Sequence, residues 1–290
     1  MSRSGLVRAS RILFLAVLLA ACSQAPQQPQ QPSPREPGEG DPLKPGSNMV
    51  VHRDLDEHGF WLASSFEQPV CGYYGRPDPG CEFGVEGNVE TGPVHARTGK
   101  RAARIDRAVE RGHMGVLALV QLPVDAPAYW GVAHRIPEIP SSAFDPRKPY
   151  LEISQISPTD GRTPGWPVEV RIYEDRTLGL ALWRSDDVAR TTYRVPVDAW
   201  FYVVVEVRNG DEAAQRMWVY DEDDELVDEV ELVGDTRVEW VHERRMGQKV
   251  GGNVSTPEHL YFYADDWYIA PKDRGPLHLD ASGAPVRARG

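Results

Sequence analysis

Short hydrophobic runs separated by turn-forming residues dominate the chain between residues 49 and 272, and apolar residues at helical spacing are scarce. The runs are rich in β-branched and aromatic residues, and proline, glycine and aspartate lie between them. The runs predicted to be strands are YWGVAHRIP, YLEISQIS, PVEVRIY, LGLALWR, WFYVVVEVR, QRMWVYD, ELVDEVELV and HLYFYADDWYI. Successive short strands without intervening helices are typical of antiparallel sandwiches and barrels. The pattern therefore predicts an all-β domain over residues 49–272.

Alternation within the runs predicts which side chains share a face of a sheet. In PVEVRIY the aliphatic residues point one way, and Glu169, Arg171 and Tyr173 point the other. The aliphatic faces are expected to pack together as the core. The other faces are expected to form an open, ligand-binding aromatic surface, made of Tyr173, Trp183, Trp218, Tyr220, Tyr261 and Tyr263, with Glu169, Arg171 and Glu206 as hydrogen-bonding groups.

The N-terminus has the pattern of an exported protein. Three arginines accompany an apolar run, residues 12–19, that is too short to span a bilayer. The sequence Leu-Ala-Ala-Cys that follows resembles the lipobox of bacterial lipoproteins, which implies a signal peptide over residues 1–21 and a lipid on Cys22. An ordinary signal peptide with a chance cysteine is the alternative. By the same resemblance Ser23 favours the outer membrane or cell surface, with membrane contact through the lipid alone.

Two segments that flank the predicted domain lack its hydrophobic pattern. Residues 22–48 are rich in proline and glutamine and contain little that could be buried, so an extended tether is expected. Residues 273–290 have no apolar period and are expected to be a loose C-terminal tail.

Cys71 and Cys81 are the only cysteines left once Cys22 carries a lipid. Exported compartments are oxidising, and the glycine and proline in CGYYGRPDPGC make the loop easy to close. We predict a disulfide, which would stabilise the fold by roughly 3 kcal/mol. A zinc site is the alternative use of such a pair, but no second pair of cysteines or histidines at ligand spacing lies nearby.

The charge of the chain limits its partners. The net charge is −11, and removal of the predicted signal, with its three arginines and no acids, changes it to −14. Nucleic-acid binding requires a basic surface, so no nucleic-acid partner is expected. The same acidity disfavours polyanionic ligands unless one cleft is locally basic.

Several segments in order resemble a known fold family. They are SSFEQ, VHARTGKRAARI, VPVDAWFYVVVEVR, MWVYDEDDELV and LYFYADDWYIA. Together they resemble concanavalin A-like jelly-roll domains of secreted glucanases, polysaccharide lyases and sugar-binding modules, and the resemblance covers most of residues 60–271. It implies an antiparallel jelly-roll sandwich of two sheets. One departure is Asp223-Asp224, where the family usually has Asp-Gly in a hairpin turn.

The same resemblance implies a structural calcium site. The first and last strands are neighbours in this family, and a calcium ion with oxygen ligands can tie them together. Glu67 would bind it with Asp265 or Asp266. The alternative is that one aspartate caps a backbone turn and the other is solvated. Because adjacent strand residues point to opposite faces, the aspartate pair is not expected to act together on a glycosidic bond.

Polysaccharide lyases of this fold carry a Gln-x-His pair with an arginine and a tyrosine on neighbouring strands. Gln155 is present here, but Ser157 stands in place of the histidine. Arg171 and Tyr173 are candidates for the neutralising group and the acid, and His134 is a candidate replacement base. An ordinary half-buried strand histidine is the alternative for His134.

Three functions are compatible with these patterns. The first is a surface-tethered, non-catalytic lipoprotein domain that binds a polysaccharide or oligosaccharide. The second is an enzyme, with a polysaccharide lyase acting on uronate polymers favoured over a glycoside hydrolase. The third is a structural lipoprotein of the cell envelope. No cofactor other than calcium is expected.

Overall fold

The structure is a computed structural model of the chain. It describes residues 51–52, 60, 62–73, 76–86, 88–93, 95–107, 114–120, 128–158, 168–182, 187–208, 210–236, 246–252, 259–271, 277–279 and 285–287. The predicted signal peptide and tether lie outside these residues, and so does Trp183. No helix in the described ranges has the length and hydrophobicity that a membrane span requires.

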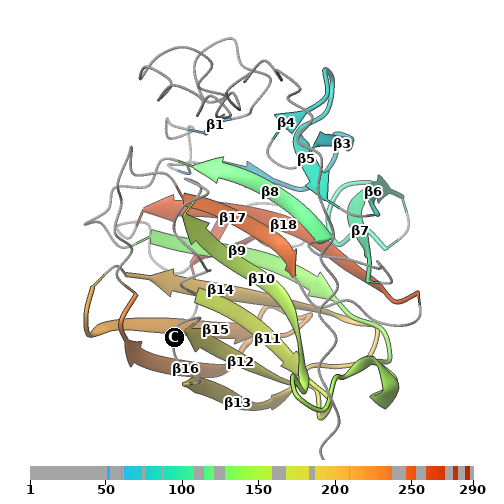
Figure 1. The fold of residues 1–290 in the computed structure, drawn as a ribbon. Coiled ribbons are helices and arrows are strands. Elements are labelled where there is room, and N and C mark those ends of the chain that lie inside the picture. The colour runs from blue at the N-terminus through green and yellow to red at the C-terminus, as the bar shows by residue number, and fades with distance from the viewer. Residues whose placement is uncertain are drawn as a thin grey trace, which may run out of the picture. The chain divides into compact units, whose positions relative to one another are not determined.

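One sheet has ten described strands, in the order β13-β12-β11-β10-β17-β8-β5-β3-β4, with β1 paired to β8 (Figure 1). The pairs β1–β8 and β3–β5 are parallel and the others are antiparallel. The strands are β1 (Val51–His52), β3 (Val70–Tyr73), β4 (Arg76–Pro77), β5 (Phe83–Glu86), β8 (Met114–Val120), β10 (Tyr150–Pro158), β11 (Val168–Tyr173), β12 (Thr177–Leu182), β13 (Val188–Arg194) and β17 (Met246–Gly252).

A second sheet has eight described strands, in the order β16-β15-β14-β9-β18-β7-β6, with β2 paired to β18. All of its pairs are antiparallel. The strands are β2 (Leu62–Ser64), β6 (Val89–Gly92), β7 (Ala102–Asp106), β9 (Ala128–Arg135), β14 (Trp200–Val207), β15 (Ala213–Tyr220), β16 (Leu226–Gly234) and β18 (Tyr261–Pro271). A short 3-10 helix, η1 (Ser141–Ala143), lies between β9 and β10.

The chain passes repeatedly between the two sheets, which makes the fold a jelly-roll sandwich. β7, β9, β14–β16 and β18 belong to the eight-stranded sheet, whereas β8, β10–β13 and β17 belong to the ten-stranded sheet. Buried aliphatic side chains of both sheets form one core, which includes Val170 and Leu180 from one sheet and Val203 and Met217 from the other. The all-β fold class and the inward aliphatic face of PVEVRIY are confirmed.

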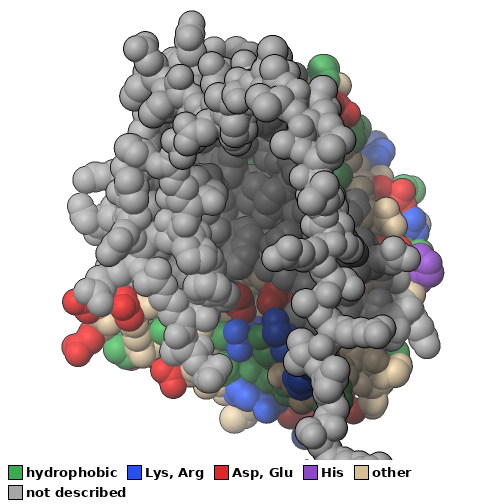
Figure 2. All heavy atoms as spheres, in the orientation of Figure 1, with side chains coloured by type: hydrophobic (Ala, Val, Ile, Leu, Met, Phe, Trp, Pro, Cys, Tyr) green, Lys and Arg blue, Asp and Glu red, His purple; other side chains and the backbone are tan. Residues whose placement is uncertain are grey.

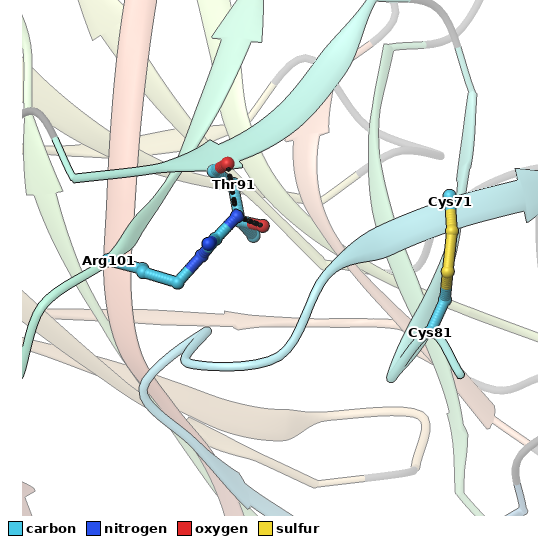
Figure 3. Close-up of a disulfide and its surroundings, with 4 residues drawn as sticks. All are labelled: Cys71, Cys81, Thr91 and Arg101. Atoms are coloured by element: carbon cyan, nitrogen blue, oxygen red, sulfur yellow. Dashed lines mark hydrogen bonds between the residues drawn. A yellow bond between two sulfur atoms is a disulfide. The ribbon is translucent and has the colours of Figure 1, made fainter.

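The disulfide between Cys71 and Cys81 is confirmed (Figure 3). Its Cα atoms are 5.7 Å apart, and it joins β3 to the segment that leads into β5. In the same view Arg101 Nη2 donates hydrogen bonds to the carbonyl oxygen and hydroxyl of Thr91, at 2.8 and 3.0 Å. The disulfide and this bridge between β6 and β7 each fix a short connection near a sheet edge.

Two short strands are described within the segment that we expected to be a loose tail. β19 (Leu277–Leu279) and β20 (Pro285–Arg287) pair as a two-stranded sheet, and β19 lies against β14 and β9. The outer faces of β9 and β14 carry buried tyrosines, Tyr129 and Tyr202. Strands of three residues are too short to show an apolar period, so the pattern of the sequence contains no sign of them.

His134 lies in the core between the sheets, on the same side of β9 as Trp130 and Val132. Its ring lies 5.8 Å from the ring of Phe201, and its Nε2 has no hydrogen-bond partner among the described residues. Burial lowers the pKa of His134 to about 3. The ring is therefore neutral at neutral pH, and it does not face the outer side of either sheet.

We predict that His134 reduces acid stability. Below the ordinary histidine pKa of 6.5 the unfolded chain protonates His134, whereas the folded chain keeps it neutral down to about pH 3. The free energy of unfolding should therefore fall with decreasing pH by about 1.4 kcal/mol per pH unit from this residue alone. Urea unfolding of the wild type and of His134→Phe across this range would measure the difference. Parallel curves for the two proteins would contradict the prediction.

Candidate functional site

Polar side chains gather on the outer face of the ten-stranded sheet where β10 lies beside β11. Glu169, Arg171 and Tyr173 alternate along β11 with core residues. Across the strand pair, Gln155 lies opposite Glu169, and Glu152 lies opposite Arg171. All of these residues except Tyr173 are buried. We refer to these five residues as the β10–β11 cluster.

An irregularity in β10 brings Glu152 into this cluster. Residues three apart in a regular strand point to opposite faces. The register of β10 shifts between Glu152 and Ser154, and Gln155 Nε2 therefore reaches Glu152 Oε2 and donates a hydrogen bond to it. Gln155 Oε1 is buried and has no hydrogen-bond partner among the described residues. A buried acceptor without a partner is a position at which a ligand hydroxyl can donate.

Arg171 is held by both a carboxylate and an aromatic ring. Its Nε and Nη2 donate to Glu169 Oε2 at 3.0 and 2.8 Å. Its guanidinium carbon lies 4.0 Å from the centre of the Tyr150 ring, and the Tyr150 and Tyr173 rings are 6.0 Å apart. Two hydrogen bonds and a cation–π contact fix the plane of the guanidinium. These hydrogen bonds use Nε and Nη2 of Arg171, so its Nη1 group is available to bind a ligand.

The ring of Tyr173 packs against Gly179 and lies under the guanidinium of Arg190. A Cβ atom at position 179 would lie 2.8 Å from Tyr173 Cε2, so only glycine lets the ring lie so close to β12. The Arg190 guanidinium carbon lies 3.9 Å from the centre of the ring. Arg190 Nη2 donates to Asp175 Oδ1 at 2.7 Å. The face thus carries two tyrosine rings, each beneath an arginine.

Burial makes Glu169 a group that titrates near neutral pH. Glu169 is 2% exposed. Burial and the charge of Glu152 raise its pKa to about 7, although Arg171 acts in the opposite direction. Burial also lowers the pKa of Arg107 to about 10, and here the charge of Glu152 opposes the change. Perturbed carboxyl groups of this kind are frequent at functional sites, and they also occur in structural ion-pair networks.

Figure 2 shows how charge is distributed on this side of the molecule. Basic side chains gather over β11–β13, and acidic side chains lie next to them. Arg171 and its partner Glu169 lie on β11. Arg190 lies on β13, and its partner Asp175 lies in the turn between β11 and β12. The chain is acidic as a whole, but several basic side chains lie together on this face.

The predicted single aromatic surface is wrong, because its residues lie on two different sheets. Tyr173 is on the ten-stranded sheet, whereas Trp218 and Tyr220 lie in a buried cluster on the outer face of the eight-stranded sheet. Tyr261 and Tyr263 are half-buried on β18 of that second sheet. Alternation separates the two faces of one strand, but it does not say which sheet the strand joins.

The other predicted residues are also divided. Glu206 lies on the eight-stranded sheet, where Arg208 Nε donates to it at 2.7 Å. His134 is not near Gln155, Arg171 and Tyr173 on the outer face, because it points into the core. Gln155, Arg171 and Tyr173 lie on the adjacent strands β10 and β11, and their roles stay a prediction. The structure adds four residues that the sequence did not single out, Tyr150, Glu152, Gly179 and Arg190.

Asp265 and Asp266 are both fully buried, and both bind the same loop between β6 and β7. The backbone N–H groups of Arg97 and Thr98 donate to Asp265 Oδ2 at 2.8 and 3.1 Å. Arg97 Nη1 donates to Asp266 Oδ2 at 2.8 Å, and the Thr98 hydroxyl donates to Asp266 Oδ1. The expectation that adjacent carboxylates diverge is wrong here. The pairing of β18 with β9 shifts at this point and Asp266 has a φ of 48°.

Glu67 lies at the other end of the same loop. It is exposed, and its Oε1 accepts from the backbone N–H of Lys100 at 2.6 Å and of Arg101 at 3.2 Å. Among the described residues, no group of three or more His, Cys, Asp or Glu side chains is arranged to hold a metal ion. Glu67 Oε1, Asp265 Oδ2 and both carboxylate oxygens of Asp266 accept hydrogen bonds from protein donors. The calcium site stays a prediction, and it would require these hydrogen bonds to be exchanged for the ion.

Comparison with known proteins finds similar structures, but no family model or curated protein that matches the sequence. An endo-β-1,4-glucuronan lyase from the fungus Trichoderma reesei is 11% identical, with a TM-score of 0.49 over 73% of this chain and 95% of that one. An alginate lyase from Aplysia kurodai is 11% identical (TM-score 0.45; 63% and 87%), and lectin II from Ulex europaeus is 10% identical (0.45; 72% and 98%). Likeness of this degree does not identify residues that bind or react.

We predict that Arg97 is essential for stability. Its side chain is 6% exposed, and it pairs with Asp266 and with Asp224. Arg97→Met would leave the buried Asp266 without its cation, so the free energy of unfolding should fall by about 3 kcal/mol. Arg104→Met is the matched control, because Arg104 pairs with an exposed glutamate, Glu90, and should cost about 1 kcal/mol or less. Equal losses in denaturant unfolding would contradict a special role for Arg97.

Proposed function

We propose that the protein binds a saccharide on the outer face of β10–β13. The observation that carries this proposal is the pair of tyrosine rings, Tyr150 and Tyr173, each with a guanidinium fixed over it. Fixed planar donors bind hydroxyl and carboxylate oxygens with little loss of conformational entropy. Gln155 adds a buried acceptor for a hydroxyl donor. The group of basic side chains over β11–β13 favours a saccharide that carries acidic groups.

A second candidate function is β-elimination on such a saccharide, and the pKa of Glu169 favours it. A pKa of about 7 lets the Glu169 carboxylate accept a proton from a sugar carbon next to a carboxylate group. Arg171 would neutralise that carboxylate group. Burial raises the pKa of Tyr150, so its hydroxyl stays protonated and could give its proton to the departing oxygen as the C–O bond breaks. The rate should then rise with pH through about 7, as Glu169 ionises.

We predict that Arg190→Ala weakens saccharide binding about tenfold, a loss of about 1.4 kcal/mol. Binding by the full chain in detergent would be measured calorimetrically over a panel of uronate polymers and neutral glycans. Arg216→Ala is the matched control. Arg190 pairs with Asp175 at 2.7 Å with side-chain exposures of 42% and 43%, and Arg216 pairs with Glu231 at 2.6 Å with exposures of 44% and 43%. Arg216 lies on the other sheet, so its loss should leave affinity unchanged.

The outcomes of this panel separate the candidate functions. Binding that is lost in Arg190→Ala alone supports the proposed face. A rise in ultraviolet absorbance from unsaturated sugar ends, which disappears in Glu169→Gln, would make the protein a lyase. No binding to any member of the panel would contradict the proposal, and a structural role in the cell envelope would then be favoured.

We also propose that a lipid on Cys22 tethers this domain to the outer membrane or the cell surface. The support is the sequence of residues 1–23 and the proline-rich segment after it, which lie outside the described residues. Cys22→Ser should abolish labelling by radioactive palmitate and move the protein from the membrane fraction to the soluble fraction. A variant that still fractionates with membranes would contradict the lipid anchor.

A further inference from the structure

A pocket lies on the outer face of the eight-stranded sheet, on the opposite sheet from the β10–β11 cluster. Its volume is about 390 Å³, which is within the range of small-molecule sites. The residues that line it are Asn88, Val89, Glu90, Arg104, Asp106 and Tyr261, from β6, β7 and β18 and the residue before β6. Of these, only Tyr261 was predicted to contact a ligand.

Strand pairing explains why these polar groups meet. Glu90 lies opposite Arg104 in the β6–β7 pair, and Asp106 lies opposite Tyr261 in the β7–β18 pair. The residues that alternate with them, such as Ile105 and Phe262, are in the core. The backbone positions of the pocket are therefore fixed by buried neighbours on each strand.

The side chains of the pocket are held by one another. Arg104 pairs with Glu90, and its guanidinium carbon lies 4.7 Å from the centre of the Tyr261 ring. His259 Nδ1 lies 2.7 Å from Asp106 Oδ2, and the His259 ring stacks on Tyr261 at 6.2 Å between centres. Asp106 is buried, whereas the side chain of His259 is 68% exposed. The pocket is thus a prearranged polar site beside a fixed aromatic ring.

We propose that this pocket binds a neutral sugar residue. It offers donors, the Arg104 guanidinium and the Asn88 amide, next to acceptors, the Glu90 and Asp106 carboxylates. Neighbouring hydroxyls of a sugar both donate and accept, so a mixed set of this kind suits them. Two carboxylates against one guanidinium disfavour an anion. This ligand differs from the one proposed for β10–β13, where Arg171, Arg190, Arg194 and Lys148 lie near the carboxyl groups, and the proposal does not rest on that function.

Saturation-transfer NMR on the full chain in detergent tests the proposal. The probes are glucose, galactose, mannose and N-acetylglucosamine, with glucuronate as the anionic comparison. We expect saturation to be transferred from the protein to at least one neutral sugar. The transfer to glucuronate at this pocket should be weaker. Asn88→Ala and Tyr261→Ala should each weaken that binding about tenfold, and Asn88→Ala removes an exposed residue that the core does not need. Thermal unfolding would confirm that both variants are folded.

Arg190→Ala separates this site from the face on β10–β13. If a neutral sugar binds and only the Asn88 and Tyr261 variants lose it, the second site is supported whatever the outcome for β10–β13. If Arg190→Ala loses the neutral sugar and Asn88→Ala and Tyr261→Ala keep it, the sugar binds the first face and the second site is overturned. Absence of binding by all four neutral sugars, or equal binding of glucuronate at this pocket, would also overturn it.

Discussion

The attachment of the β6–β7 loop to Asp265 and Asp266 is the constraint on which the eight-stranded sheet depends. β18 lies between β7 and β9, so the irregular step at these two aspartates is in the interior of the sheet. The donors of Arg97 and Thr98 satisfy their buried carboxylates, and the Tyr202 hydroxyl donates to the carbonyl of Asp266 at 2.6 Å. A buried carboxylate without such partners would be strongly destabilising. The aspartates therefore close the fold, and Arg97 supplies a positive charge beside the Asp266 carboxylate.

Irregular strand pairing also positions the candidate sites. The shift in β10 places Gln155 on the same face as Glu152, and Gln155 Nε2 donates a hydrogen bond to Glu152 Oε2. β7 and β18, which the aspartate attachment stabilises, carry three of the residues around the pocket at Tyr261. Bulges change the direction of a side chain while the rest of the ladder stays regular. Rigid sheets with local irregularities thus supply both the scaffold and the convergent polar groups.

Local patterns predicted most of the fold but only part of the sites. Period-two alternation and the order of the motifs were enough for the sandwich, because burial of aliphatic faces dominates the folding of such strands. They could not show that Trp218 and Tyr173 belong to different sheets, since that depends on pairing between distant strands. They could not show the bulges either, which invalidated the argument that Asp265 and Asp266 diverge. Glu152 could have been suspected, because YLEISQIS has its only acidic residue three positions before Gln155.

Net charge is a weaker guide to the ligand than the charge around each site. At physiological ionic strength the Debye length is about 8 Å, so carboxylates farther away contribute little to the potential at Arg171 and Arg190. The nearby groups decide it, and the positive ones are Arg171, Arg190, Lys148 and Arg194. They act against the carboxyl groups of Glu152, Glu169 and Asp175. Because the pKa of Glu169 is about 7, protonation of this one carboxyl makes the site more positive as the pH falls below neutrality. An acidic chain can therefore hold an acidic saccharide on β10–β13, and the affinity should increase on the acid side of that pKa.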